Sequence, residues 1–184
     1  MLYLIASDIH GSKGASELLV SLETKYNFKK IILLGDIGYS GARNIPPFDY
    51  YPISVYENLS KLKHKLIVIK GNCDSRVDEF VLGIKFRNKF KINIKSHVFY
   101  LTHGDLYSEN DFSYKDLDCF IYGHTHVYKL EKSNNHFVIN PGSLSLPKIN
   151  KEKTYIIYDD EREVFSLFDI NENRYDIIFL YFAS

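Results

Sequence analysis

Five short polar motifs in this chain could together bind metal ions. Each follows an apolar run: Asp8-x-His10, Gly35-Asp36, Gly71-Asn72, His103-Gly104-Asp105 and Gly123-His124-Thr125-His126. Carboxylate and amide oxygens combined with imidazole nitrogens suit Mn²⁺, Fe or Zn²⁺, whereas Mg²⁺ and Ca²⁺ prefer oxygen ligands alone. Any one motif is equally compatible with a turn or a helix cap. The combination, however, indicates a metal site with hydrolytic chemistry.

The apolar runs that precede these motifs predict short buried strands. They are Leu2–Ala6, Ile31–Leu34, Leu66–Ile69, Val98–Leu101 and Phe120–Tyr122. If these strands share one sheet and most run parallel, their carboxyl ends lie along one edge, where the motifs would converge. In an extended conformation Asp8 and His10 point the same way and could hold one ion, as could His124 and His126. Buried histidines that are satisfied by hydrogen bonds are the alternative for the second pair.

Strands alternate with helices in the first half of the chain. Ala15–Tyr26 and Val55–Leu62 have apolar residues at helical spacing, whereas Gly38–Pro52, with its prolines and glycines, predicts an ordered loop. The second half is mostly strand-like, with runs at Phe90–Ile94, Phe137–Ile139, Thr154–Tyr158, Val164–Ile170 and Tyr175–Phe182. We expect an α/β fold of two packed sheets flanked by helices, in a single domain that spans residues 1–184.

The composition argues against several classes of partner. With 23 basic and 23 acidic residues the net charge is zero, so no overall field attracts nucleic acid. The two cysteines, Cys73 and Cys119, are too few for a disulfide framework and predict a reducing compartment. The N-terminus lacks the pattern of a secretory signal, and the apolar run Ile177–Ala183 is too short to span a bilayer. We therefore expect a cytoplasmic protein with no membrane partner.

In their order along the chain, the motifs resemble those of the calcineurin-like metallophosphoesterase superfamily. Ser7–Gly11, Gly41–Asn44, Gly71–Ser75 and Asn140–Ser143 are similar in particular to the small bacterial YfcE-type phosphodiesterases. The resemblance covers residues 1 to about 145. It implies a four-layer α-β-β-α sandwich of two mixed sheets. It also implies two divalent metal ions, with Mn²⁺ as the first expectation and Zn²⁺, Fe and Ni²⁺ as alternatives.

The resemblance assigns seven side chains to these ions. The first ion would be held by Asp8, His10, Asp36 and His126, and the second by Asp36, Asn72, His103 and His124. Two cations that share Asp36 would stabilise a bridging hydroxide, the expected nucleophile for hydrolysis of small phosphodiesters. Asn72 and His103 are thus expected to be catalytic residues as well as metal ligands. The Asn72 amide would donate a hydrogen bond to a phosphoryl oxygen.

Cys73 stands where many relatives with broad monoesterase activity carry histidine. A thiol with an unperturbed pKa near 8.5 donates a proton to a leaving oxygen less readily at pH 7 than imidazole does. Cys73 is therefore a catalytic candidate that favours diester substrates, and a cysteine that merely packs is the alternative.

Residues around the motifs have weaker expectations. Arg43 could bind a substrate phosphate because its guanidinium is planar, and the aromatic residues of its loop could shape a substrate mouth or a subunit contact. Asp74 and Asp105 are expected either to orient ligands or to cap turns. Asn140–Ser143 is expected to form a structural turn beneath the site.

Two other functions stay open. The same fold resembles the retromer subunit Vps29, a non-catalytic protein-binding scaffold with a degraded metal site, but the ligand set here is intact. A phosphomonoesterase or a nuclease is the other alternative, and the zero net charge argues against the nuclease. By analogy with relatives, a homodimer or homotetramer is expected.

Overall fold

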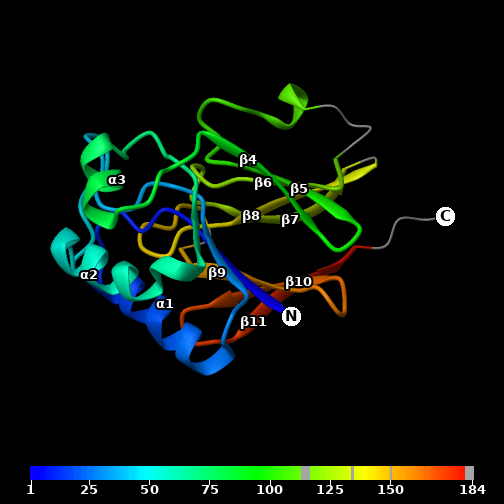
Figure 1. The fold of residues 1–184 in the computed structure, drawn as a ribbon, viewed down its shortest axis with the longest axis horizontal. Coiled ribbons are helices and arrows are strands. Elements are labelled where there is room, and N and C mark those ends of the chain that lie inside the picture. Colours follow the sequence, from blue (N-terminus) through cyan, green and yellow to red (C-terminus); the bar gives the residue numbers. More distant parts are fainter. Residues whose placement is uncertain (113–116, 134, 150, 181–184) are drawn as a thin grey trace.

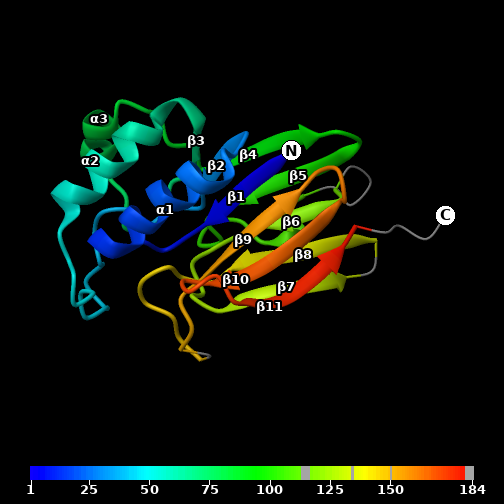
Figure 2. The same ribbon diagram turned by 90° about the horizontal axis from the view of Figure 1, so that it is seen from below.

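The computed structural model describes residues 1–112, 117–133, 135–149 and 151–180. Two β-sheets pack face to face, and three helices lie on the outer side of the first sheet (Figure 1, Figure 2). The helices are α1 (Lys13–Tyr26), α2 (Pro52–Leu62) and α3 (Arg76–Leu82). Among the described residues, no helix combines the length and the apolar character needed to cross a membrane.

The first sheet has six strands in the order β11-β10-β9-β1-β2-β3. They are β1 (Leu2–Ala6), β2 (Lys30–Leu33), β3 (Leu66–Val68), β9 (Thr154–Asp159), β10 (Val164–Asp169) and β11 (Arg174–Phe179). β1, β2 and β3 run parallel, whereas β9, β10 and β11 are joined by antiparallel pairing. The predicted last strand ended at Phe182, and residues 181–182 lie outside the described part of the chain.

The second sheet has five strands in the order β4-β5-β6-β8-β7 and is also mixed. They are β4 (Lys89–Ile94), β5 (His97–Thr102), β6 (Cys119–Ile121), β7 (Tyr128–Ser133) and β8 (His136–Pro141). The segment around the short 3-10 helix η2 (Glu109–Asp111) covers its outer face, where Phe112 and Leu117 pack against Phe120 and Val138. The predicted four-layer sandwich of two mixed sheets is confirmed.

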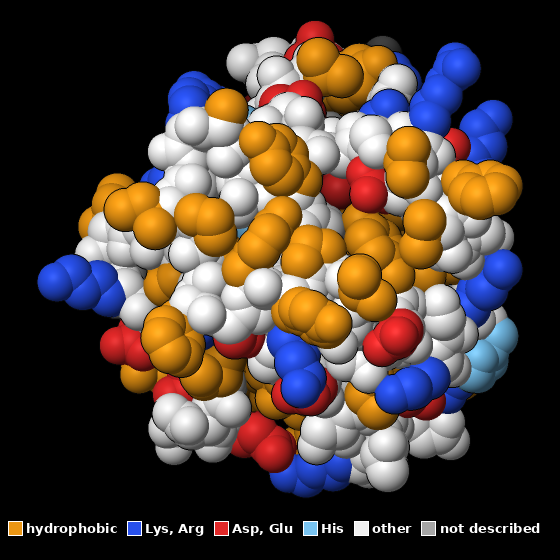
Figure 3. Space-filling model, turned by 90° about the vertical axis from the view of Figure 1, so that its left-hand side faces the viewer, with side chains coloured by type: hydrophobic (Ala, Val, Ile, Leu, Met, Phe, Trp, Pro, Cys, Tyr) orange, Lys and Arg blue, Asp and Glu red, His pale blue; other side chains and the backbone are white. Residues whose placement is uncertain are grey.

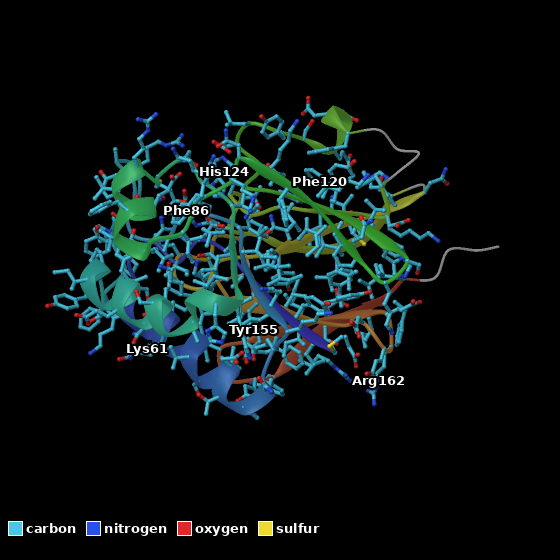
Figure 4. All side chains as sticks on the ribbon, viewed as in Figure 1. Lys61, Phe86, Phe120, His124, Tyr155 and Arg162 are labelled. Atoms are coloured by element: carbon cyan, nitrogen blue, oxygen red, sulfur yellow. The ribbon has the colours of Figure 1, made fainter. Side chains whose placement is uncertain are left out.

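Strand β1 separates the two main apolar cores. Leu4 and Ala6 pack toward α1 and α2, whereas Tyr3 and Ile5 face the second sheet, because successive side chains of a strand point to opposite faces. Burial of each such large side chain contributes about 1.5–3 kcal/mol. In Figure 4, Tyr155 marks the core on the helix side and Phe120 the cluster on the outer face of the second sheet.

The predicted strands lie in two sheets rather than one. β1, β2 and β3 belong to the first sheet, and β5 and β6 belong to the second. The motifs still meet, because hydrogen bonds connect the strand ends: His103 after β5 reaches the carbonyl oxygen of Leu34 after β2 at 2.6 Å. The condition of one shared sheet is therefore not met, whereas the expected pair of packed sheets is present, and the site lies between the ends of both.

Helix α3 and strand β7 were not predicted, and neither were the two 3-10 helices, η1 (Lys63–Lys65) and η2. Helix α3 has only seven residues, and Val77, Phe80 and Val81 are exposed, so it shows no clear apolar stripe. A capping box formed by Ser75 and Asp78 starts it instead. Strand β7 lies at the edge of the second sheet and carries charged residues, which hide its strand character.

The predicted loop after β2 is anchored to the start of α1. Ser12 caps this helix by accepting a hydrogen bond from Ala15 N–H. Asp49 accepts hydrogen bonds from the Gly14 N–H at 2.6 Å and from the Ser12 hydroxyl at 2.8 Å. The negative charge of Asp49 thus lies at the N-terminus of α1, where the helix dipole favours it.

Candidate metal centre

Most of the predicted ligands have an unusual backbone conformation. Asp8, His10, Asp36, His124 and His126 have φ angles of 56°, 47°, 55°, 63° and 59°. This left-handed region is uncommon for residues other than glycine, although Asp and His tolerate it better than most. The expected extended conformation at Asp8-x-His10 and His124-x-His126 was therefore wrong. The side chains converge through tight turns, whose strain is typical of functional sites.

One group of candidate ligands is formed by Asp8, His10 and His126. Nε2 of His10 lies 3.1 Å from Nε2 of His126, and Asp8 Oδ1 lies 3.6 and 3.3 Å from these two nitrogens. All three side chains are buried. Their ligand atoms point at one another closely enough to hold a single ion.

A second group surrounds His103. Its Nε2 lies 3.5 Å from Asp36 Oδ2, 3.2 Å from Asn72 Oδ1 and 3.2 Å from His124 Nδ1. Asp36 Oδ2 is also 3.7 Å from His10 Nε2, so this carboxylate stands between the two groups. The pairing of His126 with His10 and of His124 with His103 separates the two histidines that their spacing alone would have placed on one ion. Figure 4 shows His124 near the strand ends, on the side of the sandwich that faces α3.

Backbone carbonyl groups orient three of the four histidines. Nδ1 of His10, His103 and His126 lies 2.9, 2.6 and 2.6 Å from the carbonyl oxygens of Tyr39, Leu34 and Leu146. A carbonyl can only accept, so each Nδ1 carries a proton, and Nε2 is the nitrogen whose lone pair can bind a cation when the ring is neutral. Metal-bound histidines have this arrangement.

The donor set fits a cation. Asp8 Oδ1 is fully buried and makes no hydrogen bond among the described residues, although His126 Nε2 and His10 Nε2 lie 3.3 and 3.6 Å away. A carboxylate oxygen left in this state is costly unless a cation or a proton binds there. Oxygen and nitrogen ligands together suit a transition-metal ion such as Mn²⁺, Fe or Zn²⁺.

Opposite charges stabilise the ionised forms of these groups. Burial alone raises the pKa of Asp8, but the imidazoles of His10 and His126 outweigh it and hold this pKa well below its usual range. Burial lowers the pKa of His103, but its contact with Asp36 and the charges of both carboxylates raise that pKa to about 9. In the metal-free protein, protons on histidine thus neutralise part of the carboxylate charge that bound cations would otherwise neutralise.

Asp74 holds the backbone that carries Asp36. Its carboxylate accepts hydrogen bonds from the N–H groups of Asp36, Ile37 and Gly71 at 2.8–2.9 Å. Burial raises the pKa of Asp74 to about 6 despite these bonds. Gly71 has no room for a side chain, because a Cβ there would lie 2.1 Å from Asp36 Oδ1. Asp74 was expected either to orient ligands or to cap a turn, and these contacts agree with the first expectation.

Residues Asn140–Ser143 lie beneath the site, as expected, but Asn140 and Pro141 are the last two residues of strand β8, so the segment is not a separate turn. Ser143 Oγ and Ser145 Oγ donate hydrogen bonds to the carbonyl oxygen of Asp8 at 2.7 and 3.0 Å. Asn140 Nδ2 donates to the carbonyl oxygen of Gly123 at 2.9 Å, just before the His124 motif. Asp105, by contrast, is exposed.

A cavity of about 940 Å³ opens above the two ligand groups. Cys73 lies in its wall, half-buried, and its Sγ accepts a hydrogen bond from Asn72 Nδ2 at 3.3 Å. Burial and the adjacent Asp36 carboxylate raise the pKa of the thiol to about 12. Arg43, the residue expected to bind a substrate phosphate, also lines the cavity, together with Lys148, which the sequence did not single out. Lys148 is brought there by the hydrogen bond from its N–H to the carbonyl oxygen of His126.

Comparison with known proteins places this site in a family. Residues 1–163 match the model of the calcineurin-like phosphoesterase superfamily domain. The chain is 35% identical to phosphodiesterase YfcE of Escherichia coli K12 over 174 residues, which is 94% of each protein. The probable metallophosphoesterase YsnB of Bacillus subtilis 168 is 28% identical over 104 residues, or 52% of this chain and 57% of that protein.

Comparison with solved structures agrees with this family assignment. The structure of the E. coli phosphoesterase YfcE superposes with a TM-score of 0.90 at 31% identity and covers 98% of this chain and 100% of that chain. Vps29 of Entamoeba histolytica, solved in complex with Zn²⁺, gives a TM-score of 0.65 at 16% identity, with 98% and 100% of the two chains covered, and so shares the fold alone. The chain belongs to the calcineurin-like phosphoesterase superfamily.

Proposed function

We propose that this protein is a phosphodiesterase that hydrolyses small phosphodiesters with two divalent metal ions. The observation that carries the proposal is the position of Asp36 between two groups of candidate ligands, one with Asp8, His10 and His126 and one with His103. Two cations, when bound there, would activate water and neutralise charge on the phosphoryl oxygens.

The protein's own residues have distinct roles in this proposal. Asp8, His10, Asp36 and His126 would hold the first ion, and Asp36, Asn72, His103 and His124 the second. Asn72 is exposed at the floor of the cavity, where its amide can also reach a phosphoryl oxygen. His103 would orient the second ion through its fixed tautomer.

The cavity favours a small anionic substrate. Arg43 and Lys148 line its outer part, and the acidic side chains in the lining are Asp36 and Asp74, both buried. The two cationic side chains would bind the non-reacting side of a diester, with Arg43 forming paired hydrogen bonds to an oxyanion. Cys73 would lie near the leaving oxygen, where its neutral thiol favours diesters with good leaving groups.

Mn²⁺ is the proposed metal, with Zn²⁺, Fe and Ni²⁺ as alternatives, and the cytoplasm is the proposed location. A matrix of metals and substrates tests the function. We expect Mn²⁺ to support hydrolysis of bis(4-nitrophenyl) phosphate more strongly than that of 4-nitrophenyl phosphate. If no tested metal produces diesterase activity, the proposal fails.

The alternative functions have less support. A Vps29-like scaffold has the same fold, but such proteins are under 20% identical to this chain. Weak Mn²⁺ binding without hydrolysis of any phosphoester would favour that alternative. Preference for a monoester or for single-stranded DNA in the same matrix would favour a phosphatase or a nuclease.

We also propose that the protein is a homodimer or homotetramer. An apolar face extends over α2, α3 and the loop before α2, and it is visible as the orange side chains in Figure 3. Phe48 and Phe80 are almost completely exposed, at 109% and 86%. Such patches on soluble proteins often mark interfaces. Light scattering should give an oligomer for the wild type and for Phe179→Ser on β11, and a smaller species for Phe80→Ser.

A further inference from the structure

The Cys73 thiol lies close to His10, which also belongs to the first group of candidate metal ligands. His10 belongs to two sets of three potential ligands, one with Asp8 and His126 and the other with Asp36 and Cys73. Within each set the ligand atoms all lie within 4.8 Å of one another. Asp8 Oδ1, which is buried and makes no hydrogen bond among the described residues, is a further indication that a cation belongs at this point.

The distances leave only a small movement to complete coordination by sulfur. Zn²⁺ binds nitrogen at about 2.0–2.1 Å and sulfur at about 2.3 Å, so two such ligands on one ion are at most about 4.4 Å apart. His10 Nε2 and Asp36 Oδ2 already lie 3.7 Å apart. The Cys73 N–H donates to Asp36 Oδ1 at 2.8 Å, which keeps the cysteine backbone next to this ligand.

The surroundings of the sulfur keep it at the centre. A Cβ at Gly41 would lie only 2.9 Å from Cys73 Sγ, so the glycine backbone packs directly against the sulfur from the side of the loop. The Asn72 amide donates to the same sulfur at 3.3 Å. A hydrogen-bond donor favours a sulfur that carries negative charge, as it does in a thiolate bound to a metal.

Metal ions differ in their affinity for such a sulfur. Thiolate ligands select soft or borderline ions such as Zn²⁺, whereas Mn²⁺ prefers oxygen and nitrogen ligands. We propose that Cys73 is a conditional ligand of the first metal site. Its sulfur coordinates Zn²⁺ or Cd²⁺ bound at this site, but it does not coordinate Mn²⁺. When the sulfur–metal bond forms, the thiol proton passes to solvent. Cys73 thus determines which metal the site retains.

This inference rests on the metal binding in the proposed function, and spectroscopy tests it without an activity measurement. Metal-free protein is titrated with Cd²⁺, and the ultraviolet absorption from sulfur-to-metal charge transfer is recorded. The chain has two cysteines, so Cys119→Ser, in the buried strand β6, is the matched control. We expect the absorption in the wild type and in Cys119→Ser, and its loss in both Cys73→Ser and Cys73→Ala.

Competition between metals provides the second measurement. The ratio of Zn²⁺ to Mn²⁺ affinity should fall by at least about tenfold in Cys73→Ser, while Mn²⁺ affinity stays within about twofold of wild type. Cd²⁺ binding without the sulfur absorption, or an equal loss of affinity for both metals, would overturn the role of Cys73 alone. If the wild-type protein binds none of these metals, the proposed function and this inference both fail.

Discussion

Replacement of Asp36 by asparagine tests the electrostatics of the centre in the metal-free protein. Asp36 Oδ2 lies 3.5 Å from His103 Nε2, and both side chains are buried. Burial alone lowers the pKa of His103, so the rise from 6.5 to about 9 comes from its partners, with Asp36 first among them. At about 1.4 kcal/mol per pH unit this rise corresponds to about 3 kcal/mol.

We expect Asp36→Asn to lower the pKa of His103 by about 1 to 3 pH units, the usual effect of removing an adjacent opposite charge. Because the folded-state pKa is raised, this stabilisation is fully present below the unfolded value of 6.5 and is lost as the pH rises through about 9. The variant should therefore be less stable than wild type at pH 6, by up to about 3 kcal/mol, and the difference should shrink by pH 10.

Histidine NMR titration and urea unfolding after chelator treatment measure the two effects. Asp105→Asn, which removes an exposed carboxylate after the His103 motif, is the control and should leave His103 nearly unchanged. If the pKa of His103 in Asp36→Asn stays within about 0.5 pH unit of wild type, the electrostatic reasoning is refuted.

The same variant should lose metal affinity and activity. Two unit charges about 4 Å apart interact by about 4 kcal/mol at an effective dielectric constant near 20, so loss of the Asp36 charge beside a divalent ion should lower the affinity by at least about a thousandfold. Metal content and hydrolysis are measured together after dialysis against Mn²⁺. Survival of both would contradict the bridging position of Asp36.

Three further substitutions test separate parts of the structure. Cys73→His should raise the ratio of monoesterase to diesterase rates, because imidazole donates a proton to the leaving oxygen more readily; an unchanged ratio on matched nitrophenyl esters would exclude this role. Ser143→Ala removes a 2.7 Å hydrogen bond to the carbonyl oxygen of Asp8 and should weaken Mn²⁺ binding by about tenfold, as calorimetry can show. Asp49→Asn should lower the free energy of unfolding by about 1 kcal/mol at pH 7. Burial raises the pKa of Asp49, but its hydrogen bonds at α1 outweigh burial, and the pKa is lowered overall. The stability lost in Asp49→Asn should therefore be present above about pH 4 and diminish as the pH falls further. A loss of stability that does not depend on pH would contradict this explanation.

The local pattern of apolar residues in the sequence was sufficient to predict most of the strands and helices. The apolar runs identified ten of the strands, although their ends differ by a few residues, and helices α1 and α2 followed from apolar spacing. Such runs are visible in sequence because each strand or helix buries its own face. Helix α3 exposes most of its apolar side chains, and the edge strand β7 is only half-buried and carries charged residues, so no apolar period identifies either element.

The sequence by itself determined the types of the candidate metal ligands and the order in which they follow the strands. Only the tertiary structure decided how they combine: strands of two sheets contribute, and left-handed turns direct Asp8 and His126 toward one point. The position of Lys148 in the cavity wall and the proximity of Cys73 to His10 likewise depend on segments far apart in the chain. These features result from packing between distant segments, whose geometry depends on the whole fold rather than on neighbours in sequence.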